Sequence, residues 1–237
     1  MRVRLRYSKL GKIRFTSHRD VARMWERALR RVGLPVAYTA GFSPRPRIAF
    51  GLALSTGHES LAEFLDIDLD VTDTAGIDIA GLPGRLTPAL PVGIDVTAAA
   101  SVPPGTPSLQ ESVTSSTWRI EARGLPPADA DRLVAAALSA EHLVISRIRK
   151  GREVTDDLRP AVLSVSVAGP TVDGTELVAE LAVHPRSVRP AELLVALSPD
   201  GLEEGRVLRT AQSIWRDGNR AEPLEAVPRP HAELRAS

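Results

Sequence analysis

The chain has 237 residues, 43% of them hydrophobic and 25% charged, and it contains no cysteine. These fractions are typical of a soluble globular protein and disfavour coiled-coil, collagen-like and wholly disordered chains. No apolar run approaches the roughly 18–20 residues that cross a bilayer, and the arginine-rich start lacks the apolar stretch of a signal peptide. We therefore expect a cytoplasmic protein without membrane contact. The lack of cysteine excludes disulfides and any iron–sulfur cluster held by the chain's own thiolates.

Charge is distributed unevenly along the chain. Residues 1–50 contain 13 Lys and Arg but only two acidic residues, Asp20 and Glu26, which gives a net charge of +11. Residues 51–237 contain 17 basic and 27 acidic residues, a net charge of −10. Segregated charge of this kind indicates a positive surface directed at an anionic partner.

The first elements are a strand and a helix. A two-residue alternation predicts a half-buried strand whose outward face is a row of guanidinium groups from Arg2, Arg4 and Arg6. Ile13–Thr16 is then expected to be a short extended piece. Ser17 begins the clearest helix, with Asp20 as its capping-box partner. Apolar residues at helical spacing predict a buried face, and the residues between them predict a positive stripe of Arg19, Arg23, Arg27, Arg30 and Arg31.

The rest of the first half predicts a compact α+β unit. Residues 38–47 form a loop stiffened by prolines that displays two arginines and two aromatic side chains. Strands at 48–54 and 62–71, a weak helical stretch at 76–90 and a strand at 91–100 follow. The order β-α-β-β-α-β over residues 1–100 is that of a ferredoxin-like unit.

A similar order recurs after a segment with the composition of a linker. Residues 101–116 are rich in Pro, Ser, Thr and Gly, which predicts an exposed linker. The second half, residues 117–218, has expected elements at 117–123, 127–140, 143–149, 161–168, 176–183, 190–196 and 207–215. We therefore predict an α+β protein of two tandem ferredoxin-like (βαββαβ) halves with antiparallel sheets. Residues 219–237 are polar and proline-bearing, and we expect them to be disordered.

The basic residues of the first half are the strongest functional signal. Guanidinium groups along one helix face can follow a nucleic-acid backbone and release counterions, whereas the alternative is an ordinary solvated helix face. Phe42 in the proline loop could stack on an unpaired base or pack into the core. The predicted nucleic-acid-binding residues are Arg2, Arg4, Arg6, Lys12, His18, Arg19, Arg23, Arg27, Arg30, Phe42, Arg45 and Arg47.

The sequence offers little for chemistry by the chain itself. His18 is the candidate general base of a metal-independent ribonuclease, with Lys12 or Arg19 stabilising the scissile phosphate, and a structural or phosphate-binding histidine is the alternative. The other histidines lie at no metal-ligand spacing. An acidic solvated strand face, or a contact for a basic partner, is expected instead of a metal site at Glu63, Asp66, Asp68 and Asp70. We predict no cofactor and no metal.

Three segments together resemble a radical-SAM-linked domain family of unknown function. They read YSKLGKIRFTSHRD, ERALRRVGLP and GFSPRP, at residues 7–20, 26–35 and 41–46. Arg19 stands where the family usually has an apolar residue, and Ser43 and Arg45 replace an Asn and a His of the loop. In that family the domain is fused to a cobalamin-binding radical SAM protein or encoded beside one, commonly near a ribonuclease of the E/G type. The chain resembles the stand-alone, actinobacterial form, and the resemblance implies a radical SAM partner that supplies the cluster and the radical.

These observations lead to one hypothesis and two alternatives. The leading hypothesis is a non-catalytic accessory protein that binds RNA, such as tRNA or rRNA, through its basic half and presents it to a radical SAM enzyme on a separate chain. One alternative is the endoribonuclease that uses His18. The other is a protein–protein adaptor whose basic residues contact an acidic surface of the radical SAM partner.

Overall fold

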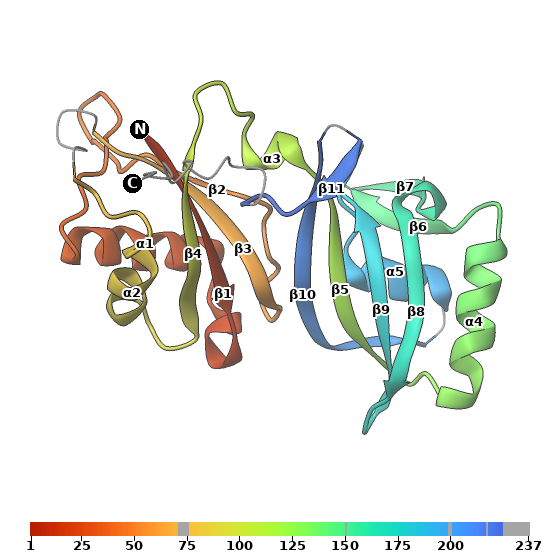
Figure 1. Ribbon diagram of the computed structural model, residues 1–237. Helices are drawn as coiled ribbons and strands as arrows, with labels where there is room; N and C mark the ends of the chain where they lie inside the picture. Colours follow the sequence, from red (N-terminus) through yellow and green to blue (C-terminus); the bar gives the residue numbers. More distant parts are fainter. Residues whose placement is uncertain (71–75, 150, 199–200, 217, 225–237) are drawn as a thin grey trace, which may run out of the picture. The chain divides into compact units, whose positions relative to one another are not determined.

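The computed structural model describes residues 1–70, 76–149, 151–198, 201–216 and 218–224 of an α+β protein (Figure 1). The chain folds into two compact units: unit 1 comprises Met1–Val113 and Ile214–Ser237, and unit 2 comprises Thr114–Ser213. The elements of the first part of the chain are β1 (Arg2–Lys9), the 3-10 helix η1 (Gly11–Phe15), α1 (His18–Arg31), β2 (Ile48–Phe50), β3 (Glu59–Asp68), α2 (Leu82–Leu86), η3 (Thr87–Ala89), β4 (Ile94–Val102) and α3 (Leu109–Ser112). The later elements are β5 (Val113–Arg123), α4 (Pro127–Ser139), β6 (Val144–Arg149), β7 (Arg152–Asp157), η4 (Arg159–Ala161), β8 (Val162–Pro170), β9 (Gly174–Ala182), α5 (Pro190–Leu197), β10 (Glu203–Arg216) and β11 (Asn219–Ala221).

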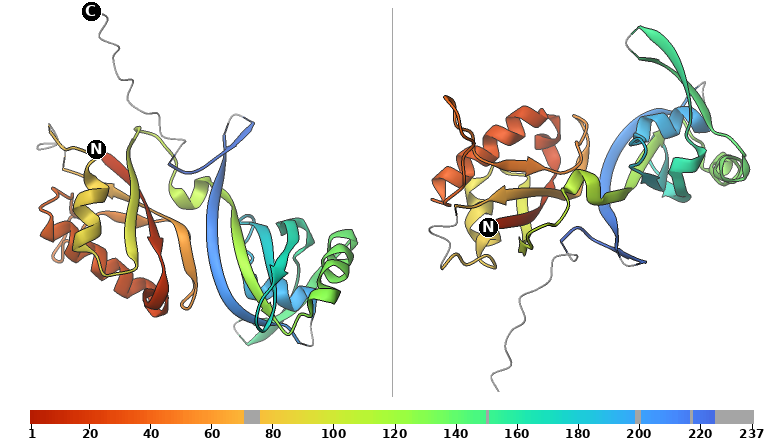
Figure 2. Two further views of the ribbon diagram at one scale, coloured as in Figure 1. Left: turned by 60° about the horizontal axis from the view of Figure 1, so that its bottom comes forward. Right: turned by 90° about the horizontal axis from the view of Figure 1, so that it is seen from above.

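Unit 1 is a sheet with its two main helices on one face. β1 lies between β4 and β3, β2 pairs with β3, and all three pairings are antiparallel. Figures 1 and 2 show α1 and α2 on the same side of these strands. The core between the layers contains the alternate residues of β1 that the sequence predicted to face inward, together with the apolar faces of the helices: Val3, Leu5, Tyr7, Trp25, Leu29, Leu82 and Leu86.

Helix α1 begins where the sequence predicted. Ser17 is its N-cap, and the Ser17 hydroxyl accepts a hydrogen bond from the backbone N–H of Asp20. The helix buries Val21, Trp25, Ala28 and Leu29, so its remaining circumference faces outward. The predicted helix and its buried face are confirmed.

The segment after β1 differs from its prediction. Ile13–Thr16 is not extended, because residues Gly11–Phe15 form the 3-10 helix η1. The buried Lys9 side chain donates hydrogen bonds to the carbonyl oxygens of Arg14 and Thr16 at 3.3 and 3.2 Å. These bonds need carbonyls that point back toward one ammonium group, which a helical turn provides and a strand does not.

Residues 101–116 contain more structure than a linker. β4 continues to Val102, α3 begins after the capping box of Ser108 with Glu111, and β5 starts at Val113. Leu109 of α3 is buried against Ala62 and Phe64 on the sheet face opposite α1. The Ser-rich composition of this segment therefore supplies a helix cap as well as turns.

The first residues of the expected disordered tail are ordered. β11 pairs with the end of β10 within unit 1, through Ile214 opposite Ala221 and Arg216 opposite Asn219. Glu222 forms an ion pair with Arg6. The remainder of the predicted tail, residues 225–237, lies outside the described residues.

Unit 2 is also built on antiparallel strands. β9 pairs with β5 and with β8, and β10 lies on the other side of β5. β6 and β7 form a separate two-stranded sheet, which extends away from the other strands of the unit in the right-hand view of Figure 2. The sequence predicted β6 but not β7, because Arg152–Asp157 is strongly charged and lacks an apolar alternation.

No helix in the described ranges is long and apolar enough to span a membrane.

Candidate nucleic-acid interface

The outward row of arginines on β1 does not form a free basic surface. Arg4 is only 1% exposed, and its Nε and one terminal nitrogen donate to the two carboxylate oxygens of Asp66 at 2.7 and 2.9 Å. The antiparallel register places Arg4 directly opposite Asp66, and Arg2 directly opposite Asp68. The predicted exposure of Arg4 is therefore wrong. On the neighbouring strand β3, an aspartate carboxylate lies directly opposite each of these two arginines.

The other arginines near this sheet are also paired. Arg6 binds Glu222 at 2.8 Å, and Asp68 binds both Arg2 and Arg47, each at 3.0 Å. Asp66 and Glu63 are buried, so the predicted solvated acidic face is wrong for these two residues, while Asp70 is exposed. Part of the positive charge of residues 1–50 is thus neutralised by ion pairs within unit 1.

Four exposed arginines of unit 1 lie around a groove between α1 and the proline loop, residues 38–47. A groove with a cavity volume of about 650 Å³ separates the outward face of α1 from this loop. We call it the basic groove, and its lining residues are Arg19, Ala22, Arg23, Glu26, Arg30, Tyr38, Pro44, Arg45 and Pro46.

Helical spacing places the arginines on one wall of the basic groove. Arg19, Arg23 and Arg30 follow one another at four and seven residues, which brings them to the same face of α1. Arg23 forms an exposed ion pair with Asp20 at 3.5 Å. Among the described residues Arg19 and Arg30 have no acidic side chain within ion-pair distance. Their guanidinium groups are therefore available to an anionic ligand.

Backbone hydrogen bonds hold the opposite wall in place. The Thr39 N–H donates to the Arg45 carbonyl, and the Arg45 N–H donates to the Thr39 hydroxyl, at 2.9 and 3.1 Å. The Arg47 N–H donates to the Ala37 carbonyl at 2.8 Å. These three bonds close the loop at its base. Tyr38, which is 53% exposed, and Arg45 are thereby fixed at the edge of the groove.

Besides the ion-paired Arg47, four of the predicted residues are exposed but do not line the basic groove. Arg27 lies on α1 and Lys12 on η1. Phe42 is fully exposed in the proline loop, so it does not pack into the core. His18 is exposed at the start of α1, with its ring 5.0 Å from that of Phe50 in an edge-to-face contact. The structure therefore brings together only part of the predicted set.

Lys9 and the residues around it are structural. Lys9 is 4% exposed, and burial lowers the pKa of its ammonium group, an effect that the nearby Glu63 carboxylate opposes. Together with Tyr7, His18 and Phe50, these two residues line a cavity of only about 20 Å³, which is too small for a substrate. No group of His, Asp and Glu in the described part of the chain is arranged to hold a metal ion.

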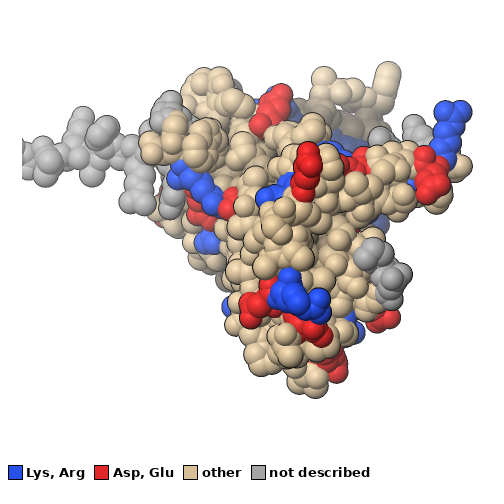
Figure 3. Space-filling view, turned by 90° about the vertical axis from the view of Figure 1, so that its right-hand side faces the viewer, with Lys and Arg blue, Asp and Glu red and all other residues tan. Residues whose placement is uncertain are grey.

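The opposite charges of unit 2 are interspersed on the face that Figure 3 shows. Blue and red side chains lie beside one another on this face, without a large area of either colour. Ion pairs such as that of Arg132 with Asp129, at 2.8 Å, occur in unit 2.

Besides Ala22, Pro44 and Pro46, the predicted set lacks two residues of the basic groove that can interact directly with a nucleic acid, Tyr38 and Glu26. Tyr38 belongs to the same loop as Arg45, and its aromatic type next to basic residues was the available signal. Glu26 reduces the net charge of the groove, and its position three residues after Arg23 places it on the same helix face.

A comparison with protein-family models matches residues 2–190 to the family described as "Uncharacterized protein conserved in bacteria (DUF2344)". The match covers most of the chain, so the chain belongs to this family. No curated protein matches it.

Proposed function

We propose that the protein is a non-catalytic accessory protein that binds single-stranded RNA in the basic groove and works with a radical SAM enzyme on a separate chain. The observation that carries the proposal is the placement of Arg19, Arg23 and Arg30 on one wall of a groove whose other wall holds Arg45 and Tyr38. Guanidinium groups bind phosphates through paired N–H donors, and an aromatic ring stacks on an unpaired base.

The size of the groove favours a strand over a compact anion. Arg19 and Arg30 are separated by 11 residues of helix, which at 1.5 Å per residue is about 16 Å. This length exceeds the spacing of neighbouring phosphates along a strand, so Arg19 and Arg30 can contact different phosphates of one strand. Phe42, exposed in the same loop, adds a second surface for stacking.

We also propose that the two units are ferredoxin-like repeats. In unit 1 the strands lie in the order β4-β1-β3, with β2 on β3, and the helices α1 and α2 follow β1 and β3. In unit 2 the order is β10-β5-β9-β8, with α4 after β5 and α5 after β9. Both arrangements support a βαββαβ repeat, with the β6–β7 hairpin inserted in the second.

The radical SAM partner is the part of the proposal that rests on resemblance. The chain contains no cysteine, so a cluster held by cysteine thiolates would belong to the partner. Unit 2 would dock this partner in the cytoplasm. Coexpression with a radical SAM protein from the same organism should yield a complex on gel filtration, and separate elution of the two chains would contradict this part of the proposal.

RNA binding is tested by changing the charge of the groove. Fluorescence anisotropy with a labelled single-stranded 12-mer and with tRNA should show at least a tenfold loss of affinity in the triple variant Arg19→Gln, Arg23→Gln, Arg30→Gln. The matched control carries three neutralised arginines in unit 2, Arg119→Gln, Arg123→Gln and Arg132→Gln, all exposed. Equal affinities of the two triple variants would contradict the proposal.

The same samples test whether the protein cleaves RNA. We expect the RNA to stay intact in EDTA, because the proposed role of the basic groove is to bind phosphates and includes no general base. Cleavage that His18→Ala abolishes would instead establish the endoribonuclease.

A further inference from the structure

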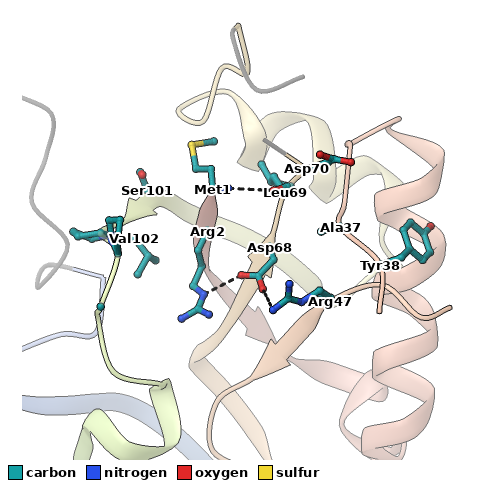
Figure 4. Close-up of a pocket in the computed structure, with 13 residues that line it drawn as sticks. Met1, Arg2, Ala37, Tyr38, Arg47, Asp68, Leu69, Asp70, Ser101 and Val102 are labelled. Carbon is teal, nitrogen blue, oxygen red and sulfur yellow. Dashed lines mark hydrogen bonds and ion pairs between the residues drawn. The ribbon is translucent and has the colours of Figure 1, made fainter. Parts of the chain in front are cut away.

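A second and larger pocket of unit 1 adjoins the basic groove (Figure 4). Its cavity volume is about 790 Å³, within the range of small-molecule sites. In Figure 4, Ser101 and Val102 lie on one side, Ala37 and Tyr38 on the other, and Asp68 lies between them. We call it the Tyr38 pocket, because Tyr38 lines both this pocket and the basic groove.

Two arginines are held in this pocket by one carboxylate. The Arg2 Nε contacts one oxygen of Asp68 at 3.0 Å, and a terminal nitrogen of Arg47 contacts the other oxygen at 3.0 Å. The side chains of Arg2 and Arg47 are 39% and 54% exposed. Two positive charges face one negative charge, and each guanidinium group has further N–H donors beyond this contact. Asp68 thus orients a pair of arginines for a single anionic group.

The other walls suit a flat, uncharged ring. Ala37 contributes apolar surface beside Tyr38, and Pro103 and Pro104 also line the pocket, whereas Leu69 and Val102 are nearly buried beneath it. A base stacks on aromatic or apolar surface whatever its identity. Asp70, exposed at the same pocket, adds a negative charge that disfavours a second phosphate.

We infer that the Tyr38 pocket binds one nucleoside monophosphate unit, with the phosphate on Arg2 and Arg47 and the base beside Tyr38. Two sources offer this chemistry: a free nucleotide, or the phosphorylated end of an RNA strand that continues from the basic groove past Tyr38. The second source rests on the proposed function, whereas the first does not.

The binding site can be mapped by NMR titration of the ¹⁵N-labelled full chain with each of the four nucleoside 5′-monophosphates. We expect shifts at the backbone amides of Ala37, Leu69 and Ser101. The corresponding nucleosides and inorganic phosphate should bind at least about tenfold more weakly, because each offers only half of the interactions. Shifts located elsewhere, or phosphate that binds as tightly as the nucleotide, would overturn the inference.

Arg47→Gln tests the role of the paired arginines. It should weaken nucleotide binding at least about tenfold, whereas Arg132→Gln, which makes the same change on an exposed helix of unit 2, should leave it unchanged. Unaltered nucleotide binding by Arg47→Gln would overturn the inference.

Arg30→Gln separates this inference from the proposed function. Arg30 lines the basic groove but no pocket that contains Arg2 or Arg47, so its loss should weaken binding of the 12-mer RNA and leave nucleotide binding intact. If the protein binds RNA but no nucleotide, the inference about the Tyr38 pocket is wrong and the proposed role of the basic groove stands. If it binds nucleotides but no RNA, the proposed role of the basic groove is wrong. A 12-mer with a 5′-phosphate that binds more tightly than its 5′-hydroxyl counterpart identifies the RNA end as the source, and equal affinities identify the free nucleotide.

Discussion

Unit 1 contains two rows of arginines in opposite surroundings. On β1, Arg4 is buried and held by Asp66, with Arg2 and Arg6 also paired to carboxylates. On α1, Arg19 and Arg30 face the basic groove, and no acidic partner lies within ion-pair distance among the described residues. The comparison shows that the arginines of one row are held by carboxylates, with Arg4 wholly buried, whereas Arg19 and Arg30 in the other row lack an acidic partner. The position of the nearest carboxylate decides how many donors of each guanidinium group are left for a ligand.

The largest expected effect is on the buried row. Arg4→Met should lower the free energy of unfolding by about 3–5 kcal/mol, because it leaves the buried Asp66 carboxylate without its partner. Urea denaturation followed by circular dichroism measures this change. The double variant Arg4→Met, Asp66→Leu should recover much of the loss. A single variant as stable as the unmodified chain would show that the pair does not support the fold.

A smaller effect is expected at the start of the helix that carries the exposed row. Ser17→Ala removes the acceptor of the Asp20 N–H and should cost about 1 kcal/mol of unfolding free energy. Ser17→Asp, which keeps an acceptor at the N-cap, should restore most of it in the same urea measurement. Equal stabilities of the two variants would mean that the cap does not stabilise α1.

The third prediction concerns His142 and Asp157, a more exposed pair of unit 2 that contrasts with the buried pair of Arg4 and Asp66. Hydrogen bonds from His142 and from the backbone N–H groups of Arg159 and Leu143 lower the pKa of Asp157 from 3.8 to about 2. A lowered pKa in the folded state means that this carboxylate stabilises the fold above about pH 4 and that the contribution is lost as pH falls toward 2.

Asp157→Asn should therefore reduce the dependence of stability on pH between 4 and 2, with a smaller loss at pH 7 than Ser17→Ala causes. Asparagine keeps one acceptor for the backbone N–H groups, which limits the loss at neutral pH. Thermal denaturation at a series of pH values measures both effects. A variant that retains the full acid dependence of the unmodified chain would contradict this role of Asp157.

The smallest effect on stability is expected from the exposed row. The triple variant of Arg19, Arg23 and Arg30 to Gln should change the free energy of unfolding by no more than about 0.5 kcal/mol, because exposed charges contribute little to folding. Urea denaturation provides the check. A loss of several kcal/mol would show that these arginines stabilise the fold, as Arg4 of β1 does.

The sequence predicted the local elements of unit 1 better than the partners of their charged residues. Apolar periodicity identified the buried face of α1, and the residue types at Ser17 and Asp20 identified its N-cap. Both features depend on residues close together in the chain. The fate of Arg4 depends on Asp66, 62 residues away, and an alternating strand pattern does not reveal whether the polar face meets water or a carboxylate. The basic groove was predicted only in part, since its second wall depends on how the proline loop folds back beside α1.

The salt dependence of RNA binding tests the role of the exposed row most directly. Affinity for the single-stranded 12-mer should fall linearly on a log–log plot against salt concentration. The triple variant of Arg19, Arg23 and Arg30 should reduce the slope by about 2, because each phosphate that an arginine neutralises on a single strand contributes roughly 0.7. An unchanged slope, or RNA binding that does not respond to salt, would contradict the assignment of the basic groove as a phosphate-binding surface.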